Sequence, residues 1–159
     1  MRKVLILLSV AFIVSCSSVD CPVKNWVRSY YAVYDSDGTT LDLHDTLTIY
    51  TERMDGSDTI LLNKGIGIET FDLPVSYTLP EDTLYFHFFN LDYDVTDTVW
   101  IQKENYPHFE SLECKATYFH KVTGLRYTTH AIDSLVLKNP YVNYEDQTTN
   151  FFIYPDSDR

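Results

Sequence analysis

Three aspartates, Asp92, Asp94 and Asp97, lie close enough in the sequence to bind a cation together. Carboxylate oxygens are the ligands that Ca²⁺ prefers in proteins. The spacing does not follow the EF-hand pattern, because a loop that starts at Asp92 would place Asp97 where glycine is needed and Lys103 where glutamate is needed. An irregular calcium-binding loop is therefore one hypothesis for these aspartates, and a solvated turn is the other.

Histidines and nucleophiles give no catalytic pattern. The chain contains no HExxH, Gly-x-Ser-x-Gly, P-loop or dinucleotide-binding motif. With only five glycines, phosphate-binding loops are not expected either. We therefore expect no enzyme activity and no cofactor, and we expect His87 and His120 to be packed or paired within strands. The histidines are His44, His87, His108, His120 and His130.

The N-terminus carries the clearest chemical signal. Arg2 and Lys3 precede an apolar run, residues 4–14, and the small Ser15 precedes Cys16. As a helix the run would extend roughly 17 Å, too short for a ~30 Å hydrocarbon core, so residues 1–15 are predicted to be a secretory signal peptide. The sequence Ile13-Val14-Ser15-Cys16 resembles a lipobox, which predicts a diacylglyceryl thioether on Cys16. Ordinary cleavage, leaving a free Cys16, is the alternative.

The residues after Cys16 bear on localisation. Ser17, rather than aspartate, follows the cysteine, which favours the outer membrane by analogy with lipoprotein sorting in proteobacteria. The strongly acidic patch that marks surface export in some Bacteroidota is missing, because only Asp20 lies nearby. We expect a lipid-anchored protein that faces the periplasm, with surface exposure as the alternative.

Cys21 and Cys114 remain as a pair if Cys16 is lipidated. In an oxidising compartment, such a pair predicts a disulfide, and two buried free thiols are the alternative. The tether, residues 16–21, would then reach at most ~17 Å. A domain so attached would be held close to the bilayer.

Composition limits the partners. The net charge is −11 at pH 7, and loss of residues 1–15 would make it −13. Without a basic patch to neutralise phosphates, nucleic acid is excluded as a ligand. The expected partners are the membrane, through the lipid, and an envelope protein or a glycan. After the signal peptide and the tether, residues 22–155 are long enough for one domain, and residues 156–159 are expected to form a tail.

A short pattern recurs along the chain: Asp, then Thr or Ser, then two apolar residues separated by one position. It begins at Asp45, Asp58, Asp82, Asp97 and Asp133. Aspartate suits the end of a turn, and threonine suits the start of a strand. Further strands are expected at residues 26–34, 109–122, 125–129 and 150–154, with a hairpin turn at 54–57. The fold class is therefore all-β, an antiparallel β-sandwich of about seven to nine strands, immunoglobulin-like. A partly open β-barrel is the alternative.

The same pattern also resembles the O-glycosylation sequon of Bacteroidota. The candidate acceptors are the hydroxyl residues that follow each aspartate: Thr46, Thr59, Thr83, Thr98 and Ser134. Turn-to-strand sequences produce this triplet freely, so both interpretations stay open.

Aromatic residues are abundant, with thirteen Tyr, nine Phe and two Trp. By alternation Trp26, Tyr30 and Tyr34 share one side of their strand. This side could stack on sugar rings, but cross-strand packing uses the same residues.

The arrangement resembles a lipoprotein family of Bacteroidota with a domain of unknown function. The resemblance rests on Cys16, Cys21-Pro22, the Asp-Thr-apolar strands, Pro107-His108-Phe109, Ser111–Cys114 and Thr129–Ser134. It implies the lipobox and the pairing of Cys21 with Cys114, and it brings no catalytic residues. The function expected is a non-enzymatic envelope lipoprotein that binds a partner or acts as a scaffold at the outer membrane. A glycan- or calcium-binding module and a hydrolase are the alternatives.

Overall fold

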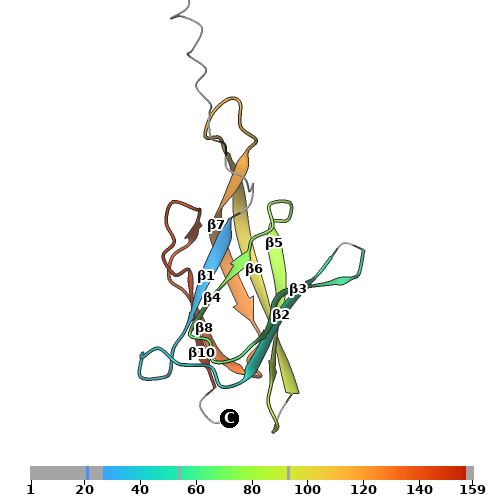
Figure 1. The fold of residues 1–159 in the computed structure, drawn as a ribbon, viewed down its shortest axis with the longest axis vertical. Helices are drawn as coiled ribbons and strands as arrows, with labels where there is room; N and C mark the ends of the chain where they lie inside the picture. Colours follow the sequence, from blue (N-terminus) through green and yellow to red (C-terminus); the bar gives the residue numbers. More distant parts are fainter. Residues whose placement is uncertain (1–20, 22–26, 54, 93, 157–159) are drawn as a thin grey trace, which may run out of the picture.

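The structure is a computed structural model that describes residue 21 and residues 27–53, 55–92 and 94–156. This part of the chain forms ten strands and no helix, which confirms the all-β prediction (Figure 1). The strands are β1 (Arg28–Val33), β2 (Thr46–Glu52), β3 (Asp58–Gly65), β4 (Thr70–Pro74), β5 (Glu81–Phe89), β6 (Asp94–His108), β7 (Thr117–Tyr127), β8 (Ile132–Leu137), β9 (Tyr141–Val142) and β10 (Phe151–Pro155).

The strands form two sheets, as expected of a β-sandwich. One sheet has the order β4-β1-β10-β8, and the other, which curls in Figure 1, has the order β3-β2-β5-β6-β7-β9. All pairs are antiparallel except β1 with β10, which run parallel and align Tyr31 with Phe151. This parallel pair brings the first and last described strands together.

Alternation along the strands builds the core between the sheets. Leu84, Phe86 and Phe88 of β5 are buried, and the residues between them are half-buried. Within the four-stranded sheet, the Tyr31 ring stacks on its neighbours Phe71 and Phe151 with centroid distances of 4.9 Å each, and across the sandwich it lies 6.2 Å from the ring of Phe86. Stacked aromatic pairs of this kind add stabilisation beyond the area they bury.

The strand boundaries agree with the recurring pattern in some places and differ in others. β2 begins at Thr46 and β3 at Asp58, and the two pair as the hairpin predicted around residues 54–57. Asp97, in contrast, lies inside β6, which begins at Asp94. The short strands β4 and β9 were not expected, and β9, with two residues, is too short to leave a periodic signal.

β7 continues through Gly124, where the sequence suggested two separate strands. The ladder with β6 shifts register between Gln102 and Lys103, opposite this glycine. A Cβ atom at Gly124 would lie 2.6 Å from Oε1 of Gln102, so a larger residue here would force the Gln102 side chain to shift; the glycine marks a close approach within a strand and not a turn.

The predicted disulfide is present. Cys21 and Cys114 are bonded, with their Cα atoms 5.4 Å apart. Cys114 lies in the loop between β6 and β7, so this bond attaches the chain near its N-terminus to the tip of the β6–β7 hairpin. Cys16 and the predicted signal peptide, residues 1–15, lie outside the described residues. Among the residues described, no helix is long and apolar enough to cross a bilayer.

Candidate functional site

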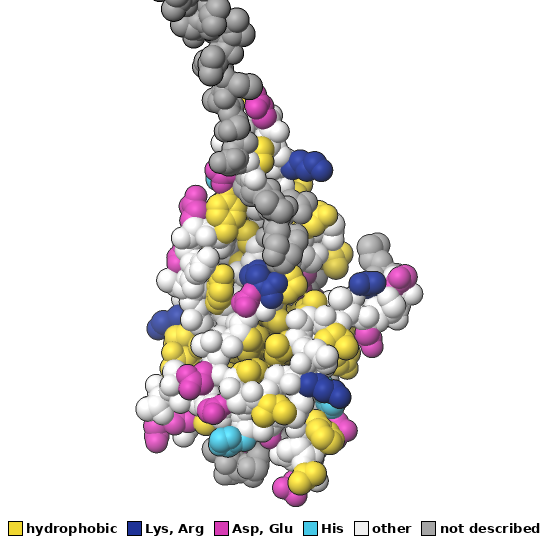
Figure 2. All heavy atoms as spheres, in the orientation of Figure 1, with side chains coloured by type: hydrophobic (Ala, Val, Ile, Leu, Met, Phe, Trp, Pro, Cys, Tyr) yellow, Lys and Arg dark blue, Asp and Glu magenta, His cyan; other side chains and the backbone are white. Residues whose placement is uncertain are grey.

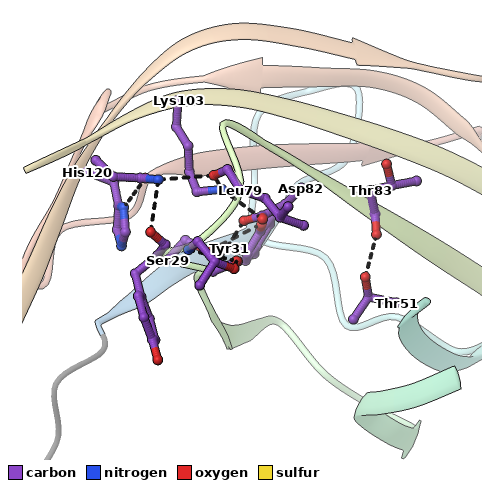
Figure 3. Close-up of polar contacts among 12 residues, drawn as sticks. Ser29, Tyr31, Thr51, Leu79, Asp82, Thr83, Lys103 and His120 are labelled. Atoms are coloured by element: carbon purple, nitrogen blue, oxygen red, sulfur yellow. Dashed lines mark hydrogen bonds and ion pairs between the residues drawn. The ribbon is translucent and has the colours of Figure 1, made fainter. Parts of the chain in front are cut away.

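Strands β2 and β5 separate partway along their length. β2 pairs with β5 only where Thr46–Tyr50 face Tyr85–Phe89, whereas β5 pairs with β6 over its whole length. Beyond Tyr50, β2 turns outward with β3 as a projecting hairpin (Figure 1). The hydroxyl of Thr51 donates a hydrogen bond of 2.7 Å across the gap to the carbonyl of Thr83 (Figure 3).

A groove of about 640 Å³ occupies this gap. Apolar side chains of β3, β5 and the β4–β5 loop form much of its wall, and hydrophobic side chains gather on this face at the base of the projecting hairpin (Figure 2). Its volume lies in the range of typical ligand pockets. The lining apolar residues include Leu61, Val75, Leu79 and Leu84, and the charged ones are Glu52, Arg53, Glu81 and Asp82.

The wall of the groove on β5 presents backbone polar groups. The amide of Lys103 in β6 donates to the carbonyl of Pro80 at 2.8 Å, so Pro80 faces β6. Successive residues of an antiparallel strand turn their N–H and C=O groups to opposite sides. Glu81 and Thr83 therefore turn theirs toward the gap, in agreement with the Thr51 contact. Among the described residues, no backbone group of β2 pairs with Glu81 or Thr83.

A polar network, buried at Lys103 and half-buried at Asn105, fixes the β4–β5 loop, which forms the second wall. The side-chain amide of Asn105 donates to the carbonyls of Tyr77 and Leu79, at 3.2 and 3.0 Å. The ammonium of Lys103 donates to the Leu79 carbonyl at 3.0 Å (Figure 3). Two residues of β6 thus hold the loop in one conformation, so the groove is formed in advance of any ligand.

Lys103 and Asp82 form an ion pair of 2.7 Å beneath the groove. The Lys103 side chain is fully buried, and Asp82, which also accepts from the amide of Ser76, borders the groove. Burial raises the pKa of Asp82 and lowers the pKa of Lys103, and the charge of each residue opposes the shift of the other. The pair is therefore a structural support in which each buried charge is stabilised by the opposite charge of its partner.

His120 completes the network behind Lys103 (Figure 3). Because the Asn105 amide nitrogen donates to the loop carbonyls, its oxygen accepts from Nδ1 of His120 at 2.7 Å. Nε2 of His120 is then an unprotonated buried acceptor, and it has no hydrogen-bond partner among the described residues. Burial, followed by the charge of Lys103, lowers the pKa of His120 to about 4. The imidazole is therefore neutral at physiological pH.

The structure separates the three aspartates considered for calcium. Asp97 is fully buried in β6, whereas Asp92 and Asp94 are exposed. Asp94 accepts from Nε2 of His87 at 2.6 Å. Within the described part of the chain, no group of three or more Asp, Glu, His or Cys side chains could hold a metal ion.

Asp97 has a structural role instead. Its carboxylate accepts from the backbone amides of His130, Ala131 and Ile132 at 2.7–2.8 Å and from the Thr128 hydroxyl at 2.6 Å. Burial alone would raise its pKa, but these hydrogen bonds outweigh burial and lower the pKa of Asp97. The residue thus ties β6 of one sheet to the turn that enters β8 of the other.

The five candidate glycosylation residues are all half-buried; Thr98 lies inside β6, and the others lie at or near strand starts: Thr46, Thr59, Thr83 and Ser134. Oγ1 of Thr59 is buried, so that side chain would have to turn before it could carry a sugar. Thr83 lines the groove. Modification at these residues stays a prediction.

The aromatic side proposed for sugar stacking is partly a packed surface. The Tyr34 ring contacts Phe152 and Tyr154, with centroid distances of 4.5 and 6.1 Å. Tyr30 is half-buried, and Trp26 lies outside the described residues. The contacts of Tyr34 correspond to the cross-strand packing that the sequence left open beside the sugar platform.

Sequence reasoning missed the groove and its support. One signal was present, because alternation from Val99 and Ile101 places Lys103 on the core face of β6. A lysine at a core position needs a buried acid and hydrogen-bond acceptors, which Asp82 and the β4–β5 loop supply.

Comparison with known proteins gives a family and no activity. No curated protein and no solved structure matches the chain. The model of one family, described as a family of unknown function (DUF6452), matches residues 46–155. The matched segment spans more than half of the chain, including the groove and its polar support. The chain belongs to the family of unknown function DUF6452.

Proposed function

We propose that this protein is a lipid-anchored envelope protein of Bacteroidota that binds a partner polypeptide and catalyses no reaction. The signal peptide, residues 1–15, and the lipobox ending at Cys16 support anchoring. The disulfide between Cys21 and Cys114 suits an oxidising compartment. Ser17 after the cysteine favours the outer membrane, and the lack of a strongly acidic patch near it favours the periplasmic side.

The separation of β2 from β5 carries the binding part of the proposal. The gap combines an apolar wall with the outward-facing backbone groups of Glu81 and Thr83. An extended polypeptide satisfies both, because its backbone adds to the free edge of β5 while alternate side chains enter the apolar groove. A free sheet edge of this kind is otherwise covered or blocked in soluble proteins.

The support beneath the groove favours binding over catalysis. Lys103, Asp82 and His120 are engaged in holding the β4–β5 loop, and the Lys103 side chain is not reachable from solvent. A preformed wall lowers the entropy lost when a ligand binds. The buried charges of Lys103 and Asp82 would thus raise the affinity of the groove for a ligand by keeping the β4–β5 loop rigid.

Site-specific photocrosslinking in cells tests the binding site. A photoreactive residue replaces Leu79 in the groove, and the control replaces Val136 on β8; these side chains are 42% and 44% exposed. We expect a polypeptide adduct from position 79 and none from position 136. A glycan adduct would favour the glycan-binding alternative, and equal adducts from both positions would contradict a specific groove.

Intact-mass measurement of the protein extracted from membranes tests the anchor. The proposal predicts loss of residues 1–15, added acyl mass, and two hydrogens missing for the disulfide. Hexose increments in the same spectrum would reveal glycosylation, for which residues such as Thr83 are the candidates. A mature chain that begins at Cys16 without lipid would contradict anchoring.

A further inference from the structure

The tip of the β6–β7 hairpin, residues 109–114, exposes two large apolar side chains. Leu112 is fully exposed, at 105%, and Phe109 is 59% exposed. The hairpin projects beyond the rest of both sheets at one end of the long axis of the molecule (Figure 1). Exposed apolar side chains grouped at such a projection are a feature of surfaces that contact other proteins or membranes.

The same tip is the part of the domain bonded to the N-terminal chain. Cys114 follows Leu112 by two residues and forms the disulfide with Cys21. Four residues separate Cys21 from Cys16, so the two cysteines lie at most ~17 Å apart. If Cys16 carries the lipid, the hairpin tip is the described part of the domain held nearest to the bilayer.

We propose that the β6–β7 tip docks on the bilayer, with Phe109 and Leu112 entering the headgroup region. This inference rests on the proposed lipid anchor at Cys16. The occupant of the apolar tip is a phospholipid surface, because the short tether brings that surface to the tip whether or not another partner is present. A lipid anchor and an apolar contact together hold a protein more firmly than either alone.

The residues below the tip suit this orientation. Tyr106 lies near the end of β6, three positions before Phe109, and is 38% exposed. Tyr141, on the strand beside β7, is 53% exposed. Tyrosine has an apolar ring and a polar hydroxyl, and it is enriched where proteins meet the membrane surface.

Two carboxylates limit the depth of insertion. Glu110 and Glu113 are exposed at the tip, and Glu110 lies 3.4 Å from Nε2 of His108. Charged carboxylates are strongly disfavoured in hydrocarbon, so they must remain in the hydrated headgroup layer. The contact is therefore shallow, with Leu112 reaching deepest.

Fluorescence quenching of the full lipidated protein in vesicles tests the contact. Leu112→Trp places a reporter at the tip, and Leu91→Trp is the matched control, because Leu91 is also fully exposed but lies in the β5–β6 turn. The vesicles contain phosphatidylethanolamine and phosphatidylglycerol, with or without bromine on the acyl chains. Wild-type protein supplies the signal of Trp26 and Trp100 for subtraction.

We expect bromine to quench the added tryptophan of L112W by roughly half and that of L91W not at all, as for a side chain at the headgroup boundary. Phe109→Trp provides a second reporter with the same expectation. Vesicle flotation separates the two proposals. Protein that floats with unquenched tryptophan at positions 112 and 109 would overturn the docked tip alone, whereas protein that neither floats nor carries acyl mass would overturn the anchor and the tip together.

Discussion

At the scale of single residues, Asp97 is the clearest structural determinant. Asp97→Asn would direct an amide group at backbone N–H donors, so we expect the free energy of unfolding to fall by about 2–3 kcal/mol. Asp94→Asn is the matched control and should change stability little, because Asp94 is exposed. Urea denaturation monitored by circular dichroism measures both. Equal stability of the two variants would contradict the role assigned to Asp97.

His120 predicts a specific dependence of stability on pH. Its pKa is about 4 in the folded protein and 6.5 as the ordinary value, so the unfolded chain binds the extra proton as pH falls between these values. Stability should therefore decrease by roughly 3 kcal/mol from pH 6.5 to 4 through this residue. Urea midpoints across this range, compared with those of His120→Gln, measure the effect. An unchanged pH profile in H120Q would show that His120 is not the cause.

The Lys103–Asp82 pair predicts coupling between two substitutions. Lys103→Met leaves the Asp82 carboxylate buried without its counter-charge, which should cost about 3–5 kcal/mol. Adding Asp82→Asn removes that charge and should restore part of the stability. A double-mutant cycle by urea denaturation measures the coupling. Additive losses would mean that the two residues do not support each other.

At the scale of elements, the disulfide constrains the end of the β6–β7 hairpin. Cys21 and Cys114 are 93 positions apart, and a cross-link over such a distance stabilises a fold by up to about 4.6 kcal/mol in the chain-entropy model. We expect Cys21→Ser with Cys114→Ser to lower the free energy of unfolding by up to that amount while the sheets still form. Thermal unfolding of this variant, with and without reductant, is the measurement. If reductant also lowered the thermal stability of the variant, the loss would have a cause other than this disulfide.

The β2–β3 turn and the strand β6 show which features local sequence preferences can predict. The hairpin turn near residues 54–57 follows from local residue preferences, and it is present between β2 and β3. Asp97 carries the same local pattern but lies mid-strand, because its partners come from residues 128–132 and not from its own turn. A local sequence pattern cannot distinguish an aspartate in a turn from one inside a strand, because the difference depends on contacts between residues that are distant in the sequence.

The groove could not be predicted for the same reason. It exists because β2 stops pairing with β5 after Tyr50, and the point at which two strands diverge is a property of the whole sheet. The alternation of Val99, Ile101 and Lys103 could have revealed the buried lysine, but not the loop that it fixes. The disulfide between Cys21 and Cys114 could be predicted from the number of cysteines alone, because a disulfide depends on few residues.

At the scale of the whole molecule, the proposals give the domain an orientation. The β6–β7 tip would face the bilayer, and the β5–β6 turn would point away from it. The groove is bordered by the base of the β2–β3 hairpin, which projects from the side of the molecule in Figure 1. A partner polypeptide could then reach β5 without displacing the membrane contact.

The central claim is that a polypeptide adds to the free edge of β5, and replacing Thr83 tests it most directly. Thr83→Pro removes an N–H that faces the gap and leaves the β6 ladder intact, whereas Thr83→Ala keeps that N–H. Both variants lose the hydroxyl. With the photoreactive residue at position 79, T83A should form the polypeptide adduct at close to its original yield and T83P should lose most of it. Equal yields from two folded variants would contradict binding through the β5 edge.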